Sequence, residues 1–191
     1  MSDILQTVSD HWVYWAVSVF AIVAAYIDGK ELRVPNKLTF PMIIAGWLYS
    51  MIAYGVQGDG WYYGLMWSLA GTAVGMLTLL PAYSIGGMGA GDVKMMAAIG
   101  AWVHCSITWH AFMVSTIVGA ILAIAMVVRS GDVRKHVDQF FFIINEIFLI
   151  RDAEKLSKIA AERKPRMKLL PYGIPLAIGT VGYFAWTGLL I

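Results

Sequence analysis

Long apolar stretches separated by short polar connections are the feature that most constrains this chain. Of its 191 residues, 59% are hydrophobic and 14% are charged, whereas a soluble domain carries about 25% charged residues. So small and apolar a chain could not cover itself with polar side chains in water. The sequence therefore predicts a single all-α domain, residues 1–191, that is embedded in a lipid bilayer as a polytopic membrane protein.

Six stretches have the character of membrane-spanning helices, which need about 20 mostly apolar residues. The fourth is irregular, because His104-Cys105-Ser106 interrupts it and Val93–Val103 alone makes only about 16 Å of helix. Either this helix continues past His104 or it begins below the membrane surface. The expected spans are His11–Ile27, Leu38–Gly55, Trp61–Tyr83, the stretch from Val93, Ile107–Val128 and Leu169–Ile191.

The basic residues are confined to alternate connections. All 14 Lys and Arg lie in residues 28–37, 84–94 and 129–168, and the remaining connections and the termini hold none. The positive-inside rule places these three connections in the cytoplasm and both termini outside, which predicts a multi-pass protein of the cell (inner) membrane. Residues 1–10 contain no basic residue, so we expect the first apolar run to be a retained span rather than a signal peptide.

The insertion 129–168 precedes the last predicted span. Its dense apolar part, Phe140–Ile150, has 11 residues and includes Asn145 and Glu146, so it is too short to cross the bilayer. We expect an amphipathic helix on the cytoplasmic leaflet. Two roles stay open for it: a docking surface for a substrate or partner, and a passive connector.

Two aspartates stand at the cytoplasmic ends of apolar runs. Asp28 closes the first run, and Asp92 follows the glycine-rich stretch 86–91. Ionisable side chains at membrane depth are expensive and tend to be functional. The alternatives are a hydrated helix end for Asp28 and the N-cap of the fourth helix for Asp92. A carboxyl pair that shares one proton can activate water and polarise a carbonyl, which predicts peptide hydrolysis.

The sequence lacks the motifs that other catalytic chemistries need. The only cysteine, Cys105, leaves no disulfide and no cysteine-based zinc site. The sequence contains no Gly-x-Ser-x-Gly, no His-Glu-x-x-His and no Walker motif. We therefore expect no metal, no cofactor and no nucleic-acid partner.

These motifs resemble those of the type IV prepilin peptidases, which belong to the Gly-x-Gly-Asp membrane aspartic proteases. The signature reads Gly89-Ala90-Gly91-Asp92 and extends to Lys94. Asp28 is followed by a short polar loop and by Pro35-Asn36. A third segment, Leu170-Pro171-Tyr172-Gly173-Ile174-Pro175, looks like the family's C-terminal Pro-aromatic-Gly element.

The resemblance implies a role for each motif residue. Asp28 and Asp92 would form the catalytic dyad, Gly89 and Gly91 would shape the active-site loop, and Lys94 would orient Asp92. The remaining motif residues would order a loop or contact the substrate: Pro35, Asn36, Pro171, Tyr172 and Gly173. The alternative for Pro35 and Asn36 is an ordinary helix start with Asn36 as its cap, and the alternative for Pro171 and Pro175 is a kinked helix start.

The function implied is removal of a short basic leader from prepilins, whose apolar helix lies in the bilayer, at the cytoplasmic face. Pilus assembly machinery is a further implied partner. Nothing before Asp28 resembles the cysteine-containing region of members that also N-methylate pilins, so the chain looks like the short form of Tad/Flp systems. Three alternatives stay open: an archaeal preflagellin peptidase, a small proton- or cation-coupled transporter component, and a non-catalytic assembly subunit.

Overall fold

The computed structural model describes residues 11–58, 60–84, 88–131 and 171–191, together with scattered positions between 134 and 159. Within these residues the secondary structure is entirely helical, which confirms the expected all-α class. The elements are α2 (Trp12–Glu31), α3 (Asn36–Gln57), α4 (Trp61–Ser84), α5 (Ala90–Ser130) and α8 (Gly173–Trp186).

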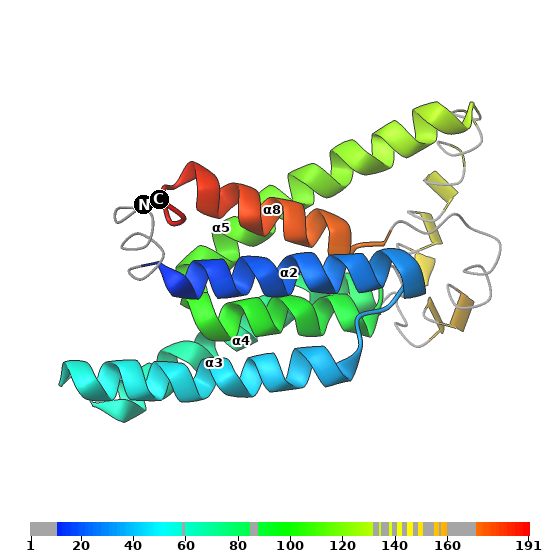
Figure 1. Cartoon of the computed structure of the whole chain (residues 1–191). Helices are drawn as coiled ribbons and strands as arrows, with labels where there is room; N and C mark the ends of the chain where they lie inside the picture. Colours follow the sequence, from blue (N-terminus) through cyan, green and yellow to red (C-terminus); the bar gives the residue numbers. More distant parts are fainter. Residues whose placement is uncertain are drawn as a thin grey trace.

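The longest helix, α5, is kinked. Its 41 residues would measure about 60 Å if straight, twice the thickness of a bilayer core. At His104 the backbone leaves the helical region (φ 61, ψ −172), and the chain turns back there (Figure 1). The expected interruption at His104-Cys105-Ser106 is therefore a sharp kink between two helical arms.

Four of the described helices are long and apolar enough to cross a membrane: α2, α3, α4 and α5. Helix α8 is apolar but has only 14 residues. The expected six spans would require each arm of α5, before and after the kink, to be a separate span. They would also require flanking residues to lengthen α8. Most of the insertion 129–168, including much of its expected amphipathic helix, lies outside the described residues, as do Gly86, Gly87, Leu169 and Leu170.

The first arm of α5 is the centre of the bundle. Met95, Met96 and Ile99 are fully buried there. Helix α4 approaches this arm closely, because a Cβ built on Gly71 or on Gly100 would lie 2.1 Å from the other glycine's carbonyl oxygen. Small residues allow such close backbone packing between membrane helices. Many large apolar side chains point outward instead, as expected for a lipid-facing surface.

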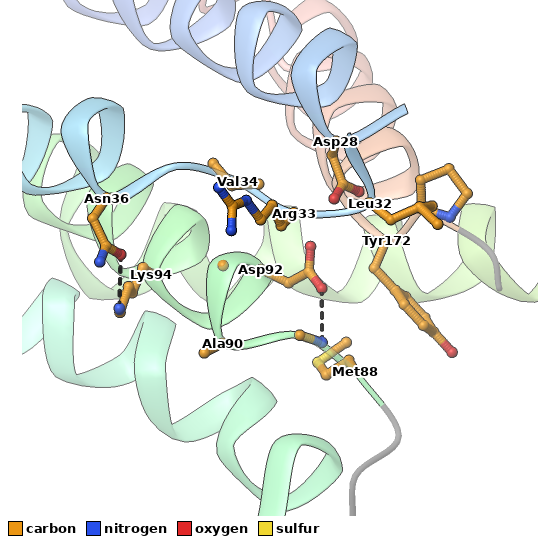
Figure 2. Close-up of a pocket in the computed structure, with 13 residues that line it drawn as sticks. Asp28, Leu32, Arg33, Val34, Asn36, Met88, Ala90, Asp92, Lys94 and Tyr172 are labelled. Carbon is orange, nitrogen blue, oxygen red and sulfur yellow. Dashed lines mark hydrogen bonds between the residues drawn. The ribbon is translucent and has the colours of Figure 1, made fainter. Parts of the chain in front are cut away.

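The helix ends that carry the sequence motifs meet at one end of the bundle. The last turn of α2 and the first turns of α3, α5 and α8 gather there (Figure 1). The connection between α2 and α3 is short: Leu32 ends α2 in a left-handed conformation (φ 52), and the extended Pro35 precedes α3. This connection carries the chain across the end of the bundle, above the start of α5 (Figure 2).

Candidate active site

A cavity of about 340 Å³ lies at this end of the bundle (Figure 2). Its walls come from α2, α5, the start of α3 and the residues just before α8. Both aspartates face it from different helices. The lining residues are Asp28, Leu32, Arg33, Val34, Asn36, Met88, Gly89, Ala90, Gly91, Asp92, Lys94, Pro171 and Tyr172.

Asp28 lies one turn before the end of α2 and is only 3% exposed. Its Oδ2 accepts a hydrogen bond of 2.8 Å from the main-chain N–H of Gly173, the first residue of α8. A buried carboxylate is costly unless it is hydrogen-bonded. Asp28 is therefore a buried and hydrogen-bonded residue near the helix end.

Asp92 lies in the first turn of α5 and is 5% exposed. The N-cap of α5 is Gly89, in an extended conformation, so the alternative in which Asp92 is the N-cap residue is wrong. Instead Asp92 is the third helical residue, and its Oδ2 accepts the N–H of Gly89 at 3.1 Å. A carboxylate here also favours the helix, whose N-terminal end carries partial positive charge.

The other motif glycine permits a close backbone approach. A Cβ on Gly91 would lie 2.7 Å from the backbone nitrogen of Val34 and 3.1 Å from its carbonyl oxygen. The connection between α2 and α3 therefore rests directly on the first turn of α5. Because the added Cβ would meet main-chain atoms rather than a flexible side chain, only glycine fits without a shift of one segment.

Lys94 bridges α5 and α3. Its Nζ donates a 2.8 Å hydrogen bond to Oδ1 of Asn36 and lies 5.1 Å from the centre of the Phe40 ring. This contact ties the start of α3 to α5 beside the cavity. Orientation of Asp92 by Lys94, which the resemblance implies, stays a prediction.

The remaining motif residues divide between the cavity and the helix starts. Pro171 and Tyr172 line the cavity, whereas Pro35, rather than Asn36, is the N-cap of α3 and accepts the N–H of Leu38 at 3.0 Å. Five lining residues were not predicted as site residues: Leu32, Arg33, Val34, Met88 and Ala90. Their only sequence signal is their position within, between or beside the motifs.

This arrangement is suited to acid–base chemistry on a bound peptide. Two buried carboxyl groups share one hollow, and one oxygen of each is already held by a main-chain N–H. Among the described residues no group of three or more His, Cys, Asp and Glu side chains is placed to hold a metal ion. Water activation by one carboxylate and carbonyl polarisation by the other would need no further group.

A comparison with known proteins matches residues 15–124 to the type IV leader peptidase family. The chain is 30% identical over 122 residues to the prepilin leader peptidase/N-methyltransferase of Neisseria gonorrhoeae, covering 60% of this chain and 40% of that protein. It is 31% identical over 109 residues to the protein of that name in Bacillus subtilis, covering 56% and 41%. It is 29% identical over 115 residues to the leader peptidase HopD of Salmonella typhimurium, covering 58% and 72%.

The chain thus spans about two fifths of the length of the two N-methyltransferase relatives. No solved structure matches it.

Proposed function

The chain belongs to the type IV leader peptidase family, and on this premise we propose that it is a membrane aspartic endopeptidase that removes the short basic leader of prepilins. Curated relatives bear the names prepilin leader peptidase and leader peptidase. The family resemblance found in the motifs and the match over residues 15–124 support the same activity.

The observation that carries the proposal is the placement of Asp28 and Asp92. They come from α2 and α5, are nearly inaccessible to solvent and face one cavity (Figure 2). In the proposed mechanism one carboxylate takes a proton from water as the oxygen attacks the scissile carbonyl. The protonated partner donates a hydrogen bond to the carbonyl oxygen and then supplies the proton that the leaving amine requires.

We place this cavity at the cytoplasmic face. Arg33 and Lys94, which line it, belong to the basic connections, and the positive-inside rule assigns those connections to the cytoplasm. A prepilin leader lies on the same side, with its cleavage point beside the apolar helix at the membrane surface. The start of a membrane helix is also where a peptide bond is reached with the least unwinding.

A neighbouring apolar groove fits the substrate's helix. This groove, with a volume of about 350 Å³, lies between α4, the second arm of α5 and α8. Met88 and Tyr172 line both the groove and the aspartate cavity, so the two hollows are adjacent. We propose that the apolar segment directly after the cleaved bond occupies it. Small residues on the α5 wall, including Gly119, Ala120 and Ala123, would let a helix backbone approach closely.

A cleavage assay tests the proposed function. The protein is co-expressed with an Flp-type prepilin, a longer type IV prepilin or an archaeal preflagellin, in wild-type form and as Asp28→Asn and Asp92→Asn. We expect the wild type to shorten at least one substrate by its leader, and both variants to reach the membrane but leave the leader attached. Failure of the wild type on all substrates, combined with aspartate-dependent proton flux in vesicles, would favour the transporter component instead.

A further inference from the structure

We infer that Gly173 is a positioning residue of this peptidase, whose main-chain N–H fixes the Asp28 carboxylate in the cleavage-competent orientation. The inference rests on the proposed function. Gly173 lies 145 positions from Asp28 in the sequence, yet its N–H donates the 2.8 Å hydrogen bond to Asp28 Oδ2. It is buried but does not itself line the aspartate cavity.

The position of Gly173 in α8 makes its N–H available. Gly173 is the first residue of the helix, and the first N–H groups of an α-helix have no acceptor within that helix. The hydrogen bond to Asp28 therefore removes nothing from the α8 hydrogen-bond ladder. The partial positive charge at a helix N-terminus also favours a carboxylate there.

The space around Gly173 excludes any side chain. A Cβ at this position would lie 2.9 Å from both Cβ and Oδ2 of Asp28 and 3.1 Å from Cγ. It would therefore press on the carboxyl group itself. The two helices also pack closely one residue further along, because a Cβ on Gly29 would be in van der Waals contact with the Ile174 side chain at 3.6 Å.

The second carboxylate is held in a similar way. Asp92 Oδ2 accepts the N–H of Gly89, and a Cβ on Gly89 would lie 3.3 Å from that oxygen. Each aspartate thus has one oxygen on a glycine N–H at a helix start. The contact at Gly173 is the tighter of the two and comes from the segment farthest away in the sequence.

A displaced Asp28 should slow the chemical step without weakening substrate binding. Misplacing a catalytic group by about 1 Å can lower a rate by about 100-fold. We therefore expect Gly173→Ala to reduce kcat by about 100-fold while KM stays within about threefold of the wild-type value. A residue with only a structural role would instead lower the amount of folded enzyme and leave kcat per folded molecule unchanged.

The experiment compares purified full-length variants in lipid nanodiscs, with kcat and KM measured on the prepilin that the wild type cleaves. Gly182→Ala is the matched control, because it lies in the same helix and an added Cβ there meets nothing within 4 Å. Folded enzyme is quantified by thermal unfolding. Asp28→Asn is included to establish that cleavage depends on the dyad.

A second replacement covers the case in which Gly173→Ala does not fold. Glycolic acid, introduced at position 173 by suppressor tRNA in a cell-free system, replaces the N–H with an ester oxygen and adds no side chain. Loss of kcat in this protein supports the inference, and wild-type kcat overturns it.

The outcomes separate the inference from the proposed function. An active wild type, an inactive Asp28→Asn and a Gly173→Ala that performs like Gly182→Ala would overturn the role of Gly173 alone. A wild type that cleaves no prepilin, or an Asp28→Asn that still cleaves, would refute the proposed dyad mechanism and the inference with it.

Discussion

Asp28 and Asp92 are ionisable side chains that folding removes almost completely from solvent, at 3% and 5% exposure. Each is compensated by a main-chain N–H from a glycine at a helix start. The sequence could single out these residues because acidic side chains beside apolar runs are unusual. It could not reveal Gly173 as the partner of Asp28, because no local pattern links residues that far apart.

The hydrogen bond between Lys94 and Asn36 is a second contact at this scale that can be tested. A double-mutant cycle with Lys94→Met and Asn36→Ala isolates it. We expect a coupling free energy of about 0.2–1 kcal/mol, measured by denaturant unfolding in detergent, because the bond is made by a charged donor but is exposed to solvent. Additive effects of the two substitutions would show that the bond contributes nothing to stability.

At the scale of helices, the sequence predicted most of the elements, but it did not predict backbone features that depend on contacts between helices. The starts and ends of α2, α3 and α4 fall within a few residues of the expected spans. The interruption near His104 was expected, but its form was not, because the kink depends on partners in other elements. Ser50 Oγ of α3 lies 3.2 Å from His104 Nε2, for example.

The contact between Gly71 and Gly100 should be essential for packing α4 against α5. Gly100→Ala places a Cβ 2.1 Å from the Gly71 carbonyl oxygen, so one helix must move. We expect the free energy of unfolding to fall by about 1–3 kcal/mol, as for other overpacked interiors. Thermal unfolding beside the Gly182→Ala control measures the loss. Equal midpoints for the two variants would contradict the packing described.

The groove beside α5 provides a prediction about substrate binding. Ala120→Phe fills the proposed site of the substrate's apolar segment, so KM should rise about 10-fold or more with kcat little changed, because binding is lost rather than chemistry. Ile121→Phe is the control, since Ile121 is 60% exposed and does not line the groove. Equal KM values for the two variants would exclude this groove as the docking surface.

For the whole molecule, charge placement is the strongest evidence for orientation. All 14 basic residues lie in connections that the alternation of spans assigns to one side. Four of the described helices qualify as spans, and the full topology, including the insertion 129–168, is still a prediction. Sequence patterns identify apolar segments well, but they do not show how the segments pack, because every lipid-facing helix has a similar composition.

The orientation can be measured with cysteine labelling. Cys105 is first replaced by alanine. One single-cysteine variant is Arg33→Cys, in the connection after α2, and the other is Gln57→Cys, at the end of α3. An impermeant maleimide added to intact spheroplasts should label the second variant, and the first only after permeabilisation. The reverse pattern would place the aspartate cavity on the outer face.

The central claim is that Asp28 and Asp92 act as one catalytic unit, and single-turnover cleavage by the two Asp→Asn variants and by the double variant tests it most directly. Groups that act together give losses that do not add. Each single variant should therefore lose about as much activity as the double variant, on the order of 1,000-fold or more, while unfolding at a temperature similar to the wild type. A single variant that keeps substantial cleavage, or losses that multiply in the double variant, would contradict a shared dyad.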